Sequence, residues 1–170
     1  PIYYSVTMEP QNEDWLFSLD MPLWKTMYGK RRGDFTLRAK RKIRRRIRYD
    51  MASMLMYETG QLSPEEQYRA NRLPANANPR TLELGKELEE RYFDPEDRVT
   101  AALEMFVEEG FVYTLNPPVL GSWPVDEFLF DTRRGFCSHY ATSFAYLMRA
   151  SGVPARVVAG YQGGQLNPVS

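Results

Sequence analysis

The sequence predicts an α+β protein in which a β-rich region over residues 1–78 precedes a helical region over residues 79–170. In the first region apolar and polar residues alternate, which is the pattern of half-buried strands. In the second region Asn-Pro and Asp-Pro pairs precede apolar residues at helical spacing. Residues 58–77 are polar and rich in turn formers, so we interpret them as a loop or linker, with a domain boundary near residue 78.

Two stretches of the first region have the two-residue period of a strand. Residues 2–8 place apolar side chains on even positions, and residues 34–50 place them mostly on odd positions. In the second stretch most Lys and Arg residues lie on even positions, which predicts a strand or hairpin with one buried face and one cationic face. Residues 15–19 form a further short apolar segment.

The basic stretch has a second interpretation, because runs of Lys and Arg also bind nucleic acid or anionic lipid. The chain carries 22 Lys and Arg against 22 Asp and Glu, so its formal net charge is zero. That balance offers no wider basic field, which favours the structural interpretation and argues against a general nucleic-acid binder. Salt-dependent binding to an acidic surface through residues 38–48 stays open as an alternative.

The first two predicted helices have clear start and stop signals. Asn78 and Asp94 each stand directly before a proline, and we expect them to cap helices over residues 79–91 and 95–109. Gly110 is expected to end the second helix.

The rest of the chain predicts a strand, a helical segment, a helix and a second strand. The short strand covers residues 111–115, and one or two helical turns are expected within residues 125–131. The last helix covers residues 137–150 and is stopped by Gly-Val-Pro at residues 152–154. A strand is expected over residues 155–161.

Cys137 is the one cysteine of the chain, which excludes an internal disulfide and a cysteine-based zinc cluster. In the first turn of the predicted helix, unpaired N–H groups and the helix dipole favour a thiolate, to which Arg133 and Arg134 would add positive potential. The same N–H groups could donate to an oxyanion, and Gly135 leaves room for close approach of a substrate. Position and composition equally allow Cys137 to be the first core residue of an amphipathic helix.

Several segments resemble a known family. Residues 135–141 (GFCSHYA) and 147–161 (LMRASGVPARVVAGY) are similar to the core of the transglutaminase-like superfamily. More narrowly, residues 113–118 and 126–134 resemble TgpA-type bacterial membrane proteins, and residues 6–17 resemble the β region before their catalytic domain. The resemblance is specific in the second half of the chain and weak in the first.

This family implies a papain-like α+β core with a Cys-His-Asp triad, of which the chain would supply the nucleophile-bearing helical half. Cys137 matches the family's nucleophile. The family's His and Asp follow in segments that residues 1–170 do not contain, so this stretch alone is expected to be inactive. In the full-length protein the resemblance implies an acyl-thioester, resolved by an amine in glutamine gamma-glutamyl transfer or by water in amide or peptide hydrolysis.

The resemblance also implies a protein or peptide substrate and a location in the periplasm. The chain would be a periplasmic domain of a bacterial inner-membrane protein, anchored by segments outside it, because it has no apolar run long enough to span a membrane. A non-catalytic binding or assembly module with the same fold is the alternative. A reactive thiol favours the enzyme, and an inert, buried thiol favours the module.

Three further side chains are weaker candidates for the site. Family relatives imply that Tyr113 assists the oxyanion, but its place at the end of a predicted strand favours a half-buried core tyrosine. Trp123 could line a substrate cleft or anchor its loop. His139 lies two residues from Cys137, and on a helix this spacing turns the two side chains apart, so we expect His139 to pack or hydrogen-bond beside the site. We see no metal-ligand cluster and no phosphate-binding loop, and we expect no cofactor and no metal.

Overall fold

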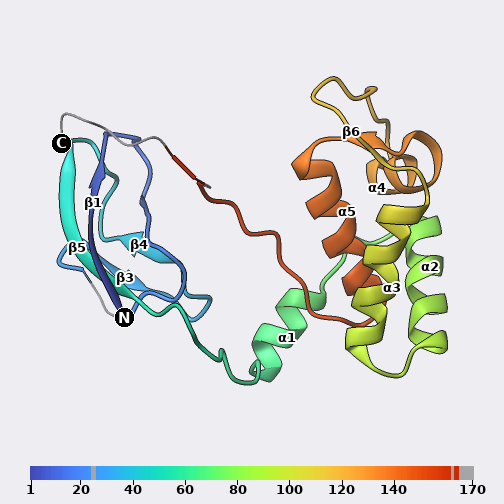
Figure 1. Ribbon diagram of the computed structural model, residues 1–170, viewed down its shortest axis with the longest axis horizontal. Coiled ribbons are helices and arrows are strands. Elements are labelled where there is room, and N and C mark those ends of the chain that lie inside the picture. Colours follow the sequence, from blue (N-terminus) through green and yellow to red (C-terminus); the bar gives the residue numbers. More distant parts are fainter. Residues whose placement is uncertain (24–25, 162, 165–170) are drawn as a thin grey trace. The chain divides into compact units, whose positions relative to one another are not determined.

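The computed structural model describes residues 1–23, 26–161 and 163–164 (Figure 1). The chain folds into two compact units: an N-terminal unit, Pro1–Gly60 with the described residues from Gly160 onward, and a helical unit, Gln61–Ala159. Each unit has buried apolar clusters of its own. Residues 61–77 lie in the helical unit, and the domain boundary predicted near residue 78 stays a prediction.

The N-terminal unit contains two small antiparallel sheets. β1 (Ile2–Met8) pairs with β5 (Ile47–Ser53) along its whole length. β2 (Trp15–Leu16), β4 (Leu37–Ala39) and β3 (Gly29–Arg31) form the second sheet, in that order. In β1 the odd residues are exposed and the even residues are partly or fully buried, so the alternation predicted this strand correctly.

Residues 34–50 contribute strands to both sheets, and the single strand or hairpin predicted there is wrong. β4 and β5 do not pair with each other, and residues 40–46 between them form no strand. The predicted burial is nevertheless confirmed, because apolar odd residues of this stretch join β1 and β2 in one core. The buried members of that core are Met8, Leu16, Leu37, Ile43, Ile47, Tyr49 and Met51.

A helix, α1 (Pro64–Asn71), replaces part of the loop predicted over residues 58–77. Ser63 and Glu66 form a capping box: the Glu66 N–H donates to Ser63 Oγ (3.3 Å), and the Ser63 N–H donates to the Glu66 carboxylate (3.1 Å). Hydrogen bonds from the Ser63 side chain and backbone lower the pKa of Glu66. The Ser-Pro-Glu-Glu sequence is typical of a capping box at a helix start, but the polar composition of the stretch led to the prediction of a loop.

The two helices after α1 have almost the predicted bounds. α2 (Pro79–Arg91) begins and ends as expected, and α3 (Pro95–Glu108) ends one residue early. The Asp94 carboxylate caps α3 by accepting a backbone N–H of the first turn (2.9 Å). Gly110 follows α3 in a left-handed conformation with φ of 75°.

α5 (Cys137–Ala150) has the predicted bounds and lies beside α2 and α3 (Figure 1). Only its C-terminal part is deeply buried, through Ser143, Ala145, Tyr146, Leu147 and Met148. The middle of α2 approaches the C-terminal end of α5 closely, because a Cβ atom on Gly85 would lie 2.6 Å from the Ala150 carbonyl carbon. This contact between helices fixes the body of the helix that begins with Cys137.

Short elements connect α3 to α5. β6 (Val112–Tyr113) pairs in parallel with β7 (Arg134–Gly135). Between them in the sequence lie α4 (Pro124–Asp126) and a π-helical segment, η1 (Glu127–Thr132), which together confirm the predicted helical turns.

The strand predicted over residues 155–161 does not form. Its first residue is fixed, since the Ala155 N–H donates to the Ala70 carbonyl (3.2 Å) and its carbonyl accepts from Arg149 Nε (2.8 Å). Val158, by contrast, is 88% exposed. A strand needs a neighbouring backbone to bond with, and none of the strands in the described part of the chain pairs with this segment.

Candidate active site

Cys137 is exposed and is the first residue of α5. The first N–H groups of a helix lack an intrahelical partner, and the residue before Cys137 is Phe136, whose side chain has no oxygen with which to cap them. The positive end of the helix dipole therefore lies at the thiol, with backbone donors directed out of the helix beside it. This exposed position does not fit a first core residue, which was the alternative interpretation of Cys137.

The chain segment that leads into Cys137 is held in place by the β6–β7 pair. The Val112 N–H donates to the Arg133 carbonyl (2.8 Å), and the Thr114 N–H donates to the Gly135 carbonyl (2.8 Å). Tyr113 lies opposite Gly135 in this pair, and thus beside the segment that enters α5. Its side chain is 61% exposed, and its ring stacks against Tyr140 at 6.2 Å. Tyr113 is available to a ligand, and its part in catalysis stays a prediction.

His139 stabilises the beginning of α5. Its Nδ1 accepts a hydrogen bond from the Phe136 N–H (3.3 Å), which places any ring proton of a neutral His139 on Nε2. The ring also packs edge-on against Phe136 and contacts Phe128. Gly135 is required by this packing, because a Cβ there would lie 2.6 Å from the Cβ of His139 and 2.8 Å from the Phe128 ring. His139 thus packs and hydrogen-bonds in the first turn of the helix.

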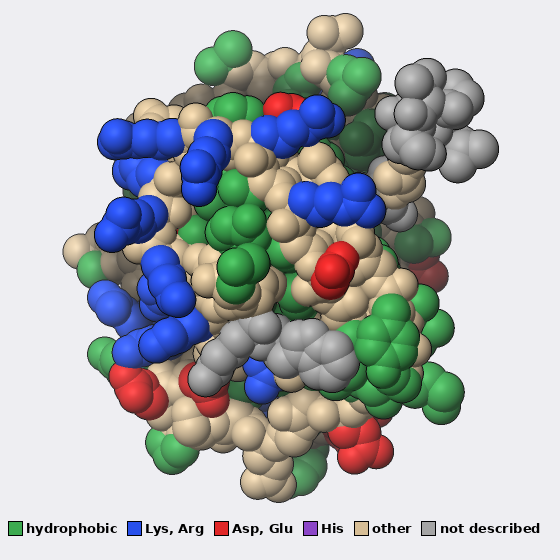
Figure 2. Space-filling view, turned by 90° about the vertical axis from the view of Figure 1, so that its left-hand side faces the viewer, with side chains coloured by type: hydrophobic (Ala, Val, Ile, Leu, Met, Phe, Trp, Pro, Cys, Tyr) green, Lys and Arg blue, Asp and Glu red, His purple; other side chains and the backbone are tan. Residues whose placement is uncertain are grey.

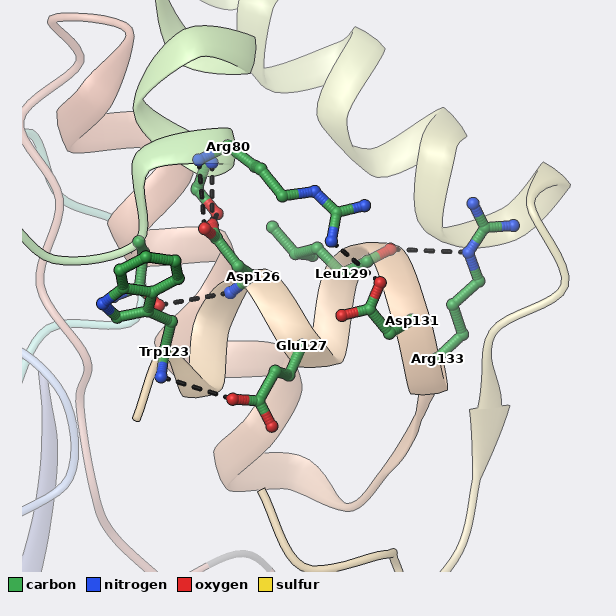
Figure 3. Close-up of polar contacts among 9 residues, drawn as sticks. Arg80, Trp123, Asp126, Glu127, Leu129, Asp131 and Arg133 are labelled. Carbon is green, nitrogen blue, oxygen red and sulfur yellow. Dashed lines mark hydrogen bonds and ion pairs between the residues drawn. The ribbon is translucent and has the colours of Figure 1, made fainter. Parts of the chain in front are cut away.

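Arg133 does not simply add positive charge at Cys137. It has a left-handed backbone (φ 50°), and its guanidinium donates to the Glu109 carbonyl (2.8 Å) and pairs with the Glu109 carboxylate (2.9 Å). It also donates to the Leu129 carbonyl (Figure 3). Its charge is therefore largely committed to the end of α3, which leaves Arg134 as the exposed cation of this segment.

Trp123 lies in a turn that Glu127 holds closed. The Glu127 carboxylate accepts from the Gly121 N–H (2.6 Å) and the Trp123 N–H (3.3 Å), while the Glu127 N–H donates to the Trp123 carbonyl (3.0 Å). Figure 3 shows the indole ring directed away from this carboxylate. With 49% of Trp123 exposed, the backbone is anchored while the ring remains accessible. Sequence reasoning did not identify Glu127, although it is an acid near the start of a predicted helical segment.

Asn78 and Asp126 cap each other's helices. The Asp126 carboxylate accepts from the N–H groups of Arg80 (3.0 Å) and Thr81 (2.8 Å) at the start of α2. The Asn78 side-chain oxygen accepts from Val125 (3.0 Å) and Asp126 (3.2 Å) at the start of α4. Asn78 stands at the N-cap position of α2 as predicted, and its carbonyl accepts from the Leu82 N–H (3.1 Å), but its side chain makes no capping bond to α2. The exchange ties α4, directly before η1, to the start of α2.

Tyr146 joins α5 to the same arrangement. Its hydroxyl donates to the Ala77 carbonyl (2.6 Å), directly before Asn78. Burial is the main reason that the pKa of Tyr146 is raised, so the hydroxyl stays protonated and keeps donating. The helix carrying Cys137 is thereby connected to the paired caps of α2 and α4.

Neither a metal centre nor a membrane span is found in the described part of the chain. These residues contain no group of three or more His, Cys, Asp or Glu side chains placed to hold a metal ion. Among the helices that they form, none is both long enough and apolar enough to cross a bilayer. The expected absence of a metal and a cofactor stays a prediction.

Two family descriptions cover most of the chain. Residues 83–169 match the transglutaminase-like superfamily, and residues 1–60 match the TgpA N-terminal domain. The chain belongs to the transglutaminase-like superfamily. The family match includes Cys137, Tyr113 and Trp123, although it assigns no role to any of them.

Solved and curated relatives agree with the superfamily assignment. The chain is 42% identical to the periplasmic domain of TgpA from Pseudomonas aeruginosa, whose crystal structure it matches with a TM-score of 0.92 over 98% of its own length and 58% of that chain. The same domain bound to ethylmercury matches with a TM-score of 0.91. These matches confirm the predicted α+β transglutaminase-like fold.

Among curated proteins, the chain is 42% identical over 166 residues to a protein-glutamine gamma-glutamyltransferase of Pseudomonas aeruginosa. It is 30% identical over 100 residues to the uncharacterized protein YebA of Bacillus subtilis. The chain spans 25% of the length of the first relative and 14% of the second.

Proposed function

We propose that this chain supplies the nucleophile of a transglutaminase-like enzyme, and that Cys137 forms an acyl-thioester with a protein or peptide substrate. The observation that carries the proposal is the exposed thiol in the first turn of α5, within the segment that matches the superfamily. Backbone N–H groups at this helix start are placed to donate to an oxyanion on the substrate carbonyl.

The reaction has two steps. The Cys137 thiol gives its proton to a base and the thiolate attacks a carboxamide carbon; the carbon–sulfur bond forms, and the carbon–nitrogen bond breaks as that proton leaves with ammonia. A primary amine then attacks the thioester carbon and gives a proton to the base; the new carbon–nitrogen bond forms, and the carbon–sulfur bond breaks to release the thiolate. We expect the base that removes and returns protons to lie outside residues 1–170, because the one histidine of the chain, His139, uses Nδ1 to accept the Phe136 N–H. This stretch alone is therefore expected to be inactive.

Glutamine transfer is the favoured form of the reaction. The curated relative of Pseudomonas aeruginosa is named a protein-glutamine gamma-glutamyltransferase, which supports a glutamine donor and an amine acceptor over hydrolysis. The solved relative is a periplasmic domain, which supports a periplasmic location for this chain within a membrane-anchored protein. A non-catalytic binding module with the same fold is the alternative function.

Amine incorporation by the full-length protein tests the enzymatic proposal. The protein is incubated with a glutamine-bearing protein and a fluorescent primary amine, and both labelled protein and released ammonia are measured. Cys137→Ala is expected to lower both by about 1,000-fold or more. The matched control is Ser138→Ala, which changes an exposed neighbour in the same turn and keeps its backbone N–H. Ammonia without labelling would indicate hydrolysis, and neither product from a folded protein would favour the binding module.

Ethylmercury provides a separate test of the thiol, because thiolates bind soft metals strongly. Residues 1–170 are expected to take up one ethylmercury per chain, measured by intact mass, and none after Cys137→Ala. Iodoacetamide should also react faster with the native chain than with the unfolded chain at neutral pH, since only the folded helix places its dipole at the thiol. A slower reaction in the native state would contradict an activated nucleophile.

A further inference from the structure

The net charge of zero conceals two oppositely charged parts of the chain. Residues 1–60 carry 12 Lys and Arg against 7 Asp and Glu, a formal charge of +5, and residues 61–170 carry the compensating −5. Seven of the 12 cations lie within residues 40–48, which we call the basic ridge. A basic field therefore does exist, although the total charge of the chain does not reveal it.

The backbone of the basic ridge is held in place at its centre. Ile43 is 5% exposed, its N–H donates to the Glu13 carbonyl (2.8 Å), and its carbonyl accepts from Gln11 (3.1 Å) and Asn12 (2.9 Å). The N–H of Lys40 donates to a further carbonyl in the same unit (2.9 Å). Because the anchor is buried, the side chains on both sides of Ile43 are presented to solvent on a fixed segment.

Most of the cations on the ridge are uncompensated. Lys42 approaches Glu13 (3.7 Å) and Arg46 pairs with Glu9 (2.9 Å), both at exposed positions where an ion pair is weak. The remaining five are exposed and form no ion pair with any residue that the structure describes: Lys40, Arg41, Arg44, Arg45 and Arg48. Figure 2 shows Lys and Arg side chains gathered over one side of the face it displays.

A hollow with apolar walls lies directly beside these charges. It measures about 650 Å³ and is lined by the cations of residues 40–45 together with Tyr28, Ala39, Ile43 and Ile47. Met27 also lines it and is 78% exposed. The surface thus combines a cluster of positive charges with an accessible apolar side chain, which is the combination that binds an anionic amphiphile rather than a simple anion.

We propose that the basic ridge docks the N-terminal unit on a membrane surface that contains anionic phospholipid. Phosphate groups of the lipid would be bound by the uncompensated Arg and Lys side chains, and Met27 would enter the interfacial layer beside them. A nucleic acid would satisfy the charges but would leave the apolar side of the hollow uncovered. For this reason a lipid surface fits the site better than a nucleic acid.

Vesicle sedimentation of the chain tests this docking. Binding to phosphatidylcholine vesicles is compared with binding to vesicles that also contain phosphatidylglycerol, over a range of salt concentrations. The chain is expected to bind only the anionic vesicles, and binding should weaken as salt rises because exposed charges are screened. Arg44→Gln with Arg45→Gln should weaken it by about 30-fold, since each cation near an anionic surface contributes roughly a factor of five.

Two further variants separate lipid docking from simple attraction between charges. Lys86→Gln with Arg91→Gln removes the same charge from α2 and should leave binding nearly unchanged. Met27→Ser should weaken binding to vesicles severalfold without altering the charge. Equal losses in the two double variants, binding to neutral vesicles, or tighter binding to a duplex oligonucleotide than to anionic vesicles would each overturn the proposal. Because every substituted side chain is exposed, circular dichroism is expected to show all variants folded.

Discussion

Gly135 lies two residues before Cys137, between the His139 side chain and the Phe128 ring. Gly135→Ala would place a Cβ 2.6 Å from one and 2.8 Å from the other, so the start of α5 has to shift. We expect a loss of about 1–3 kcal/mol in the free energy of unfolding of the chain, measured by urea denaturation. In the full-length protein, amine incorporation should fall as well, since the thiol and the backbone donors move together.

Gly160→Ala is the matched control, because, apart from its two chain neighbours, no heavy atom of the described residues lies within 4 Å of the added methyl group. If Gly135→Ala kept both the stability and the activity of the parent protein, the close packing around His139 would be wrong.

Individual residues were predictable where their signal is local. The position of Cys137 at the start of a helix was predicted from one continuous motif, whereas the capping by Asn78 and Asp126 was missed. The hydrogen bonds of those two side chains join segments 45 to 48 residues apart, and no spacing along the sequence reports such a contact. The side chain that looked like a local cap serves a distant helix instead.

The start of α2 depends on a cap from another helix, which gives a test at the level of whole elements. Asp126 is 2% exposed and accepts from two backbone N–H groups of α2 and from the Thr81 hydroxyl (2.5 Å). Asp126→Ala should cost about 2–4 kcal/mol in urea denaturation, because it leaves buried donors without partners. Asp94→Ala removes an exposed cap that makes one such bond and should cost about 1 kcal/mol. If both substitutions lowered the free energy of unfolding equally, the buried hydrogen bonds of Asp126 would contribute no more than an exposed cap.

Helices were predicted better than strands, because a helix makes its hydrogen bonds within itself and a strand does not. α2, α3 and α5 were located to within a residue by their prolines, caps and stops. The segment 155–161 has strand-forming residues, yet no strand in the described part of the chain pairs with it, and it remains irregular. The prediction for residues 34–50 failed for a similar reason. The alternation of apolar and polar residues shows which side chains are buried, but it does not show which strand pairs with which.

At the scale of the molecule, the two units have separate cores. The N-terminal core includes Leu37 (2% exposed), and the helical unit buries Leu147 completely (0%) in a different cluster. Separate cores predict separate unfolding. Leu37→Ala should destabilise the N-terminal unit by about 2–5 kcal/mol and reduce amide protection in β1 and β5, leaving α2 and α5 protected. Leu147→Ala should have the opposite pattern.

Hydrogen exchange measured segment by segment distinguishes separate unfolding of the two units from the unfolding of a single cooperative fold. In a single cooperative fold, either substitution would lower protection in both units together. Independent units would also explain why the sequence could be divided into a β-rich and a helical region: each region's apolar pattern reports a core built from its own residues. The same independence would allow the basic ridge to be tested without disturbing the helix that carries Cys137.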